Sequence, residues 1–213
     1  MLDSGLLGRF YQFGEIVLLL LYVHFLWICF TLLGFIIFGI GPSTVAMFAV
    51  FRKWSMGEGD LPTFKLFWTV YRNEFVKSNL LGVILFGFGY MLYVNFNFLT
   101  LTNETWESVV RVMLIVATMV YVLMLSYIFP MYVHYENSLF GYFKNAILLA
   151  IYAPFRTIYL IAACLTLYYL FFYFPVFIFF VGASLTSFVV MFISYRTFLR
   201  LEYKQEVLQT NEG

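Results

Sequence analysis

Charged residues are scarce in this chain of 213 residues. They make up 11% of the sequence, whereas a soluble domain carries about a quarter. Hydrophobic residues account for 63%, and the mean hydropathy is +0.91. Because so few charges leave a protein surface poorly solvated by water, the composition excludes an ordinary soluble domain and indicates an integral membrane protein.

The arrangements of residues that mark enzymes and metal sites are also missing. Two cysteines are present, Cys29 and Cys164, and both fall within apolar runs, where a thiol behaves as a small hydrophobe. There is no nucleophile elbow, phosphate loop or zinc-binding His-Glu helix motif. The twelve Lys and Arg are scattered, unlike the dense basic face that nucleic acids require. We therefore expect no enzymatic activity, no cofactor, no metal and no nucleic-acid partner.

Long uncharged runs dominate what the sequence does contain. Since a helix needs about 20 apolar residues to cross a bilayer, these runs predict an all-α, polytopic transmembrane helix bundle that forms one membrane domain, with the lipid bilayer as its partner. Five spans are predicted, at about residues 16–40, 79–99, 112–133, 157–173 and 175–195. The last two are divided at Pro175, because a proline tends to end one helix and start another.

The first uncharged run, residues 16–51, is too long for a single span. A Gly-Ile-Gly-Pro segment divides it, so we predict a short separate helix over about 42–54 with Pro42 in its first turn. This helix would lie in the membrane interface and hold Arg52 and Lys53 at the lipid headgroups.

This region supplies the main candidate motif of the chain. Its members are Gly41, Pro42, Ser43, Thr44, Arg52 and Lys53. The favoured role is structural, in starting and anchoring the short helix. A weaker hypothesis is that free N–H groups at Ser43 and Thr44 receive an anion.

Lysine and arginine are distributed unevenly around the predicted spans. Ten of the twelve fall between spans one and two, between spans three and four, or after span five, and only Arg9 and Arg111 fall elsewhere. Because basic loops remain in the cytoplasm, this bias predicts a multi-pass plasma-membrane protein with its N-terminus outside and its C-terminus cytoplasmic.

Two of the cytoplasmic connections show helical periodicity. Apolar and polar residues alternate with the period of a helix over about residues 61–78 and again over about 136–152. We therefore predict two amphipathic cytoplasmic helices, which can lie in the membrane interface.

Few polar groups lie within the predicted spans. None of the spans has an Asp, Glu, Lys or Arg in its core, which argues against ion- or proton-coupled transport. His24 lies deep in the first span; it could contact a substrate or a proton, but a neutral imidazole bonded to a neighbouring helix is the favoured interpretation. For Asn95 and Asn97, near the outer end of the second span, interhelical hydrogen bonds or interfacial exposure are favoured over a role in binding.

Several short motifs resemble the YesL family of bacterial membrane proteins. They are residues 41–48 (GPSTVAMF), 52–54 (RKW), 57–58 (GE), 67–68 (FW), Phe75, 77–79 (KSN), 135–137 (YEN) and 143–146 (FKNA). They cover nearly the whole chain in order. The resemblance implies a plasma-membrane protein of the kind found in Firmicutes, whose genes often neighbour carbohydrate ABC importers, glycoside hydrolases and sensor kinases. It implies no catalytic residues.

Together these features favour a non-enzymatic accessory component that packs against another membrane complex, which the resemblance implies to be a carbohydrate ABC importer. One alternative is a small stand-alone permease, with a path around His24, Asn95 and Asn97. Another alternative is a membrane-embedded sensor or regulator.

Overall fold

The structure is a computed structural model that describes residues 6–58, 62–99 and 104–212. Every regular element in these ranges is a helix. They are α1 (Leu6–Leu33), α2 (Ile37–Ser55), α3 (Thr63–Asn73), α4 (Phe75–Phe98), α5 (Glu104–His134), α6 (Leu139–Tyr152), α7 (Pro154–Tyr173), the short π-helix η1 (Ile178–Gly182) and α8 (Ala183–Glu212). The predicted all-α fold is confirmed.

Five helices are long and apolar enough to cross a membrane. They comprise Phe10–Leu33, Phe75–Phe98, Thr105–His134, Pro154–Tyr173 and Ile178–Lys204. Each overlaps one of the five predicted spans. The prediction of a bundle with five such helices is therefore confirmed, and it indicates a multi-pass membrane protein.

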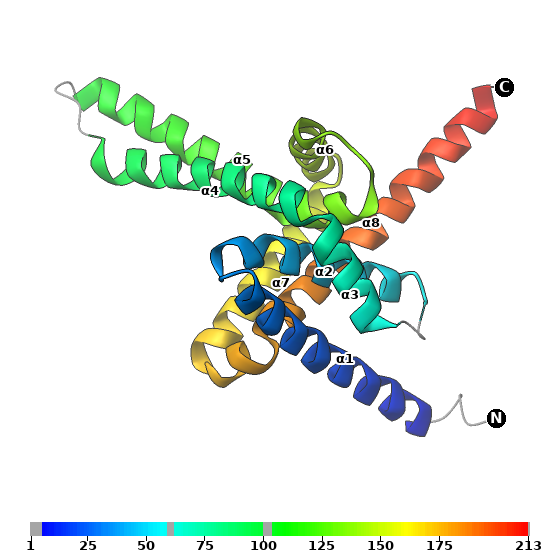
Figure 1. Cartoon of the computed structure of the whole chain (residues 1–213). Coiled ribbons are helices and arrows are strands. Elements are labelled where there is room, and N and C mark those ends of the chain that lie inside the picture. Colours follow the sequence, from blue (N-terminus) through cyan, green and yellow to red (C-terminus); the bar gives the residue numbers. More distant parts are fainter. Residues whose placement is uncertain (1–5, 59–61, 100–103, 213) are drawn as a thin grey trace.

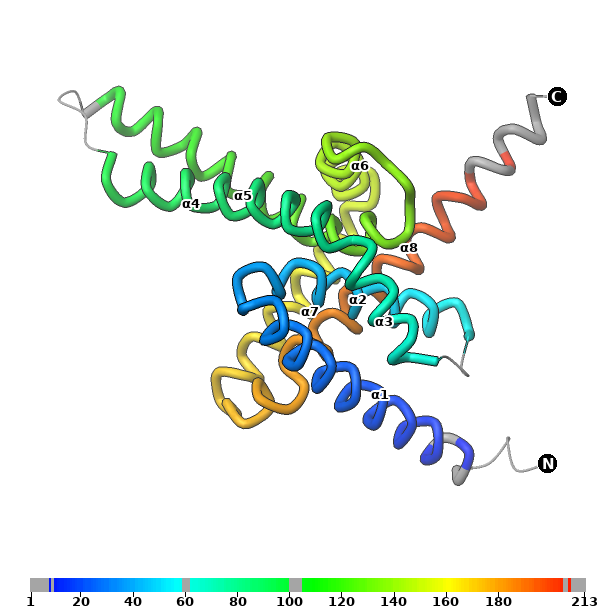
Figure 2. Tube along the Cα trace, in the orientation of Figure 1, coloured from blue at the N-terminus to red at the C-terminus, as the bar shows by residue number. Residues whose placement is uncertain are grey.

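Six of the helices form three antiparallel pairs, which are α1 with α2, α4 with α5, and α7 with α8 (Figure 1). At the left of the view α1, α4 and α7 end and α2 and α5 begin, whereas α1 begins and α8 ends on the right. The coloured trace in Figure 2 shows the same order, with α3 and α6 connecting one pair to the next. The α4–α5 pair extends furthest from the rest of the bundle.

The two sides differ in charge. We name the side where α2 ends, α4 and α7 begin and α8 ends the basic end, because these helix ends and residues 196–204 of α8 contain Arg52, Lys53, Lys77, Arg156, Arg196, Arg200 and Lys204. The opposite side, where α1, α4 and α7 end, is the tip end. The three-pair arrangement thus separates most of the cations from the turns.

The break between α1 and α2 lies at residues 34–36, so the predicted first span, 16–40, ends too late. Phe35 and Ile36 make the turn with φ angles of 53° and 65°. This left-handed region is unfavourable for side chains with a Cβ, and most of all for a β-branched residue such as Ile36. Phenylalanine and isoleucine do not predict a turn, whereas glycine and proline do. The sequence therefore predicted the helix break at the Gly-Ile-Gly-Pro segment and not at residues 34–36.

Pro42 does not start a helix but lies inside α2. A proline within a helix leaves the carbonyl four residues earlier without its N–H donor, and here that carbonyl belongs to Phe38. The Asn79 side chain of α4 supplies the missing donor, with 2.9 Å between its Nδ2 and the Phe38 oxygen. A neighbouring helix thus compensates for the hydrogen bond that the proline removes.

Helix α2 is the most enclosed helix of the bundle, contrary to the predicted interfacial position of residues 42–54. It packs against α1, α3, α4, α5 and α8. Its fully buried apolar side chains are Val45, Ala46, Met47, Val50 and Phe51. The close approach to α1 depends on Gly39, where a Cβ would stand 2.2 Å from the backbone oxygen of Thr31.

The two short helices flank this core. Helix α3 is shorter than the predicted 61–78, because it ends at Asn73 and α4 begins two residues later; residue 61 lies outside the described ranges. Its Phe67 and Tyr71 pack against Phe30 of α1, at 5.0 Å between ring centroids in both cases. Helix α6 lies against α5 within the predicted 136–152.

Candidate functional site

The first part of the site is the junction of α2 with α4. A Cβ on Gly41 would approach the backbone oxygen of Ser78 to 3.1 Å and the side-chain oxygen of Asn79 to 3.3 Å. Two motifs that carried the family resemblance, GPSTVAMF and KSN, therefore meet at this point in the fold. Their joint role is close helix packing around a proline.

The hydroxyl groups of the first motif are also engaged in packing or buried. Thr44 accepts a hydrogen bond from the indole Nε1 of Trp27 at 3.1 Å, which ties α2 to α1. Ser43 is fully buried, and its Oγ has no partner in the described ranges. Because α2 already begins at Ile37, the N–H groups of both residues lie inside the helix. The hypothesis of an anion at a helix start here is wrong.

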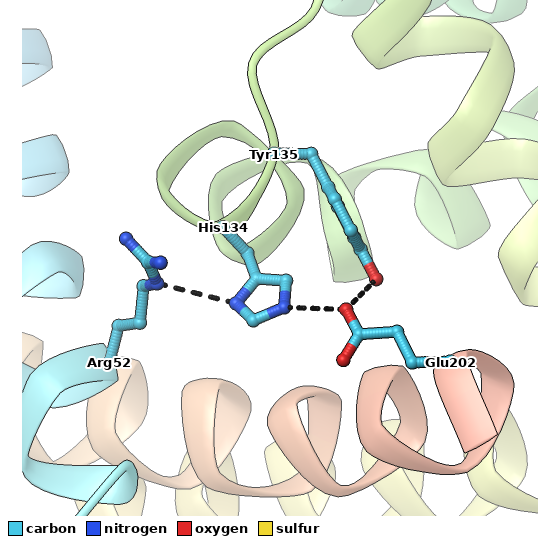
Figure 3. Close-up of polar contacts among 4 residues, drawn as sticks. All are labelled: Arg52, His134, Tyr135 and Glu202. Atoms are coloured by element: carbon cyan, nitrogen blue, oxygen red, sulfur yellow. Dashed lines mark hydrogen bonds and ion pairs between the residues drawn. The ribbon is translucent and has the colours of Figure 1, made fainter. Parts of the chain in front are cut away.

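The second part is a hydrogen-bonded chain that joins the ends of α2 and α5 to a position within α8 (Figure 3). Arg52 donates from Nε to Nδ1 of His134 at 3.3 Å, and His134 Nε2 lies 3.2 Å from Oε1 of Glu202. A guanidinium only donates, so Nδ1 is the acceptor and Nε2 carries the proton that goes to the carboxylate. Tyr135 donates to the same carboxylate oxygen at 2.8 Å. The chain connects α2, the end of α5 and α8 through a neutral imidazole.

This geometry adds a contact of Arg52 that the sequence did not predict. Its side chain donates a hydrogen bond from Nε to His134. Lys53 is more exposed and forms an ion pair with Glu58 at 2.9 Å. Burial, followed by the hydrogen bond to Glu202, raises the pKa of Tyr135, so this phenol stays protonated as a donor at neutral pH.

A second polar cluster lies beside the first. The Tyr132 hydroxyl donates to Glu74, which occupies the junction between α3 and α4. The ammonium of Lys77 lies 5.4 Å from the ring centroids of both Tyr132 and Tyr142, within cation–π range. The Tyr142 hydroxyl then donates to the backbone oxygen of Tyr135 at 3.1 Å and holds the α5–α6 connection in place.

A cavity of about 810 Å³ separates these clusters. Its walls come from α2, α3, the start of α4, the end of α5, the α5–α6 connection and α6. Its polar lining consists of Arg52, Lys53, Asn73, Glu74, Lys77, Tyr132, His134, Tyr135, Glu136, Asn137, Ser138 and Tyr142. Both signs of charge and several neutral donors therefore face one space at the basic end.

Most of this site lies outside the sequence candidates. Arg52 and Lys53 belonged to the predicted motif, whereas Glu74, Lys77, His134 and Glu202 did not. The first and last partners of the hydrogen-bonded chain are far apart in sequence and share no spacing pattern. The nearest sequence signals were two motifs that carried the family resemblance: 77–79, which contains Lys77, and 135–137, which directly follows His134.

The predicted intramembrane polar residues are not brought together. His24 is 4% exposed and stacks on Trp27 at 6.0 Å between ring centroids, and its Nδ1 has no hydrogen-bond partner in the described ranges. Asn95 and Asn97 donate to the backbone oxygens of residues 91 and 93 in their own helix, α4. These side chains therefore form no common site.

Metal-binding residues are not clustered either. Across residues 6–58, 62–99 and 104–212, no group of three or more His, Cys, Asp or Glu side chains is placed to hold a metal ion. Cys29 and Cys164 are both free thiols. The chemistry available at the basic end is thus hydrogen bonding and ion pairing.

Comparisons with known proteins place the chain in a family. Residues 20–96, which include the α2–α4 junction, match the family described as "Protein of unknown function, DUF624". The chain is 36% identical to "Uncharacterized protein YteU" of Bacillus subtilis (strain 168) over 93% of its own length and 89% of that protein. It is 36% identical to YesV over 88% and 90% of the two lengths, and 26% identical to YesL over 89% and 90%. No solved structure matches significantly. The chain therefore belongs to the DUF624 family, together with these YesL-like proteins.

Proposed function

We propose that the chain is a non-enzymatic accessory protein of the plasma membrane, which acts by binding a carbohydrate importer at its basic end. This proposal rests on the location of the polar contacts between helices. At the basic end they join α2, α5 and α8, and they surround a cavity. The carbohydrate link rests on the gene neighbourhoods implied by the YesL resemblance.

The proposed membrane topology has six crossings, with α2 as the additional one. Its 19 residues span about 28 Å, close to the thickness of the hydrocarbon core. Because α1 and the other helices surround it, α2 needs less apolar surface than a helix that faces lipid, and hydropathy alone does not identify it. The contacts of Phe48 with Phe129 and of Arg52 with His134 show that α2 runs parallel to α5.

This topology places both termini in the cytoplasm, in contrast to the outside N-terminus predicted from five spans. Arg9, at the start of α1, then joins the basic side, and Arg111 is left alone on the other side. The asymmetry of basic residues becomes stronger, as the positive-inside rule favours. Reporter fusions at the N-terminus and after residue 204 should both report the cytoplasm; an external N-terminal reporter would contradict the six-crossing topology.

The exposed face of α3 offers a docking surface for the importer. Phe64 and Trp68 remain 55% and 42% exposed, although Phe67 and Tyr71 on the other face are buried. Aromatic side chains that stay exposed next to a polar face are typical of protein or membrane contacts.

Affinity purification from native membranes in a mild detergent tests the accessory role. We expect a tagged wild-type chain to recover the importer's membrane subunits, and the double variant Phe64→Ala, Trp68→Ala to lose them. Phe86→Ala is the matched control, since Phe86 is 74% exposed on α4, away from the basic end. The absence of importer subunits from the wild-type preparation would overturn the proposal.

The stand-alone permease is the second candidate. Its proposed path depends on His24, Asn95 and Asn97, and their separate contacts within α1 and α4 give that path no support. Oligosaccharide flux into liposomes that contain only this chain would favour the permease. A sensor or regulator would instead be recognised by a deletion that alters transcription without altering uptake.

A further inference from the structure

We propose that the cavity at the basic end binds a phosphate ester, with Arg52 and Lys77 as the cationic groups that hold the phosphate. The inference stands on the side chains that line the cavity and does not depend on the carbohydrate importer. Basic pockets between transmembrane helices are a common setting for headgroup binding.

Arg52 presents an unoccupied donor pair. Its Nε is taken by His134, but within the described ranges no acceptor is bonded to Nη1 or Nη2, and no carboxylate lies at ion-pair distance. Figure 3 shows the guanidinium end directed away from His134. The planar guanidinium is well suited to pairing with two phosphate oxygens, and the bond at Nε fixes its orientation beforehand.

Lys77 is the second cation of the site. Its ammonium is held over the rings of Tyr132 and Tyr142, and no carboxylate in the described part of the chain forms an ion pair with it. The negative faces of aromatic rings attract a cation without neutralising its charge. The ammonium therefore stays available to an anion that enters the cavity.

The carboxylates around the cavity limit the kind of anion. Glu74 accepts the hydroxyl proton of Tyr132, Glu136 also lines the space, and Lys53 is paired with Glu58 outside it. With both signs of charge present, a polyanion such as pyrophosphate would be repelled in part. A phosphate ester whose other substituents donate hydrogen bonds fits these walls better.

The remaining walls favour an amphiphilic molecule. Val45, Leu66, Val70 and Val133 form an apolar side of the cavity beside its polar groups. A volume of about 810 Å³ exceeds what a lone phosphate fills and accommodates a substituted ester. The same phosphate ester chemistry occurs in phospholipid headgroups and in soluble metabolites, which an experiment can separate.

The test uses the full chain in non-ionic detergent and measures its thermal unfolding. Three probes are titrated: dioctanoyl phosphatidylglycerol, dioctanoylglycerol as the same lipid without phosphate, and glycerol 3-phosphate as the soluble ester. We expect the phospholipid to raise the midpoint and dioctanoylglycerol to have no such effect. An equal effect of glycerol 3-phosphate at equal concentration would assign the site to a soluble phosphate ester, and an effect of the phospholipid alone would assign it to a headgroup.

Four variants locate the effect. Arg52→Gln and Lys77→Gln should raise the half-saturating concentration by at least about tenfold, because each removes a charged hydrogen-bond partner. Arg72→Gln on α3 and Lys144→Gln on α6 are matched controls, since both residues are exposed at the basic end but lie outside the cavity. If Arg52→Gln does not fold, Lys77→Gln provides the test, because Lys77 contacts the rings of Tyr132 and Tyr142 and donates no hydrogen bond within the described residues.

Three outcomes would overturn the site. The first is that no phosphate compound stabilises the wild-type chain. The second is that dioctanoylglycerol stabilises it as well as the phospholipid does. The third is that all four variants weaken the response alike, which would indicate a general attraction to a basic surface.

Discussion

Helix α2 and the outer half of the α4–α5 pair satisfy their polar groups in opposite ways. The α2 residues Thr44 and Arg52 bond to α1 and α5, and the Phe38 carbonyl receives a donor from α4. In the outer α4–α5 pair, Asn95, Asn97 and Thr118 bond to carbonyls of their own helix.

The two patterns reflect two different surroundings. Side chains of α2 between Pro42 and Phe51 are buried or half-buried, whereas large apolar side chains of the outer α4–α5 pair, such as Phe86 and Met113, remain well exposed. Polar groups that face lipid must find partners within their own helix, because lipid offers none. Polar groups inside a bundle can instead connect helices. The comparison therefore identifies α2 as the central helix of the bundle and the α4–α5 pair as the part that other helices cover least.

The largest expected difference comes from adding volume at a glycine in each region. Gly39→Val should lower the free energy of unfolding by about 3 kcal/mol or prevent folding, because the new side chain would enter the backbone of α1. Gly87→Val on α4 is the matched control, since a Cβ there meets nothing within 4 Å. Thermal unfolding in detergent measures both; similar midpoints for the two variants would refute the close packing of α1 on α2.

A matched pair of asparagines gives the next difference. Asn79→Ala should cost about 1–3 kcal/mol, because the Phe38 carbonyl beside Pro42 would lose its donor. Asn95→Ala should change stability by less than about 0.5 kcal/mol, since it removes a bond to a carbonyl within its own helix. Denaturation in mixed micelles compares the two, and an equal loss would show that the proline needs no compensation from α4.

The hydrogen-bonded chain at the basic end should contribute a smaller amount. Glu202→Ala leaves His134 and Tyr135 without an acceptor, and we expect a loss of about 1–2 kcal/mol, moderated because the carboxylate is 40% exposed. Arg111→Ala breaks only an ion pair within one helix, worth about 0.3–0.5 kcal/mol. If Arg111→Ala proved the more damaging in the same unfolding assay, the contrast between the two regions would fail.

The smallest effect is expected for Asn97. Asn97→Leu replaces an exposed amide that bonds only within α4, so its stability in detergent should stay within about 0.5 kcal/mol of the wild type. An unfolding midpoint that falls as far as that of Glu202→Ala would show that the outer α4–α5 pair contacts another part of the protein through this residue.

The membrane-spanning helices were predictable because hydropathy indicates whether lipid or water surrounds a helix. The runs at 79–99 and 112–133 became α4 and α5, whose exposed apolar surfaces make them easy to recognise. The same method failed for residues 34–55. A helix enclosed by other helices can carry glycine, proline and hydroxyl groups, so α2 resembled an interfacial segment.

The candidate site was less predictable than the fold. Gly41, Pro42 and Arg52 were identified from a motif, but their roles in packing and in contacting His134 depend on α4 and α5. The bond from Arg52 to His134 joins residues 82 positions apart. No local pattern specifies such a pair, because it arises from how two helices cross and from which turns face each other.

The sequence by itself determined that the protein lies in lipid, that its spans are helical and to which family it belongs. Composition and the length of hydrophobic runs can be read along the chain without knowledge of tertiary contacts. Only the tertiary structure decided that α2 is central, that the chain turns at residues 34–36, and that cations and carboxylates surround one cavity. Those features depend on which helix faces meet. Burial inside a bundle removes the hydropathy signal on which a prediction from sequence relies.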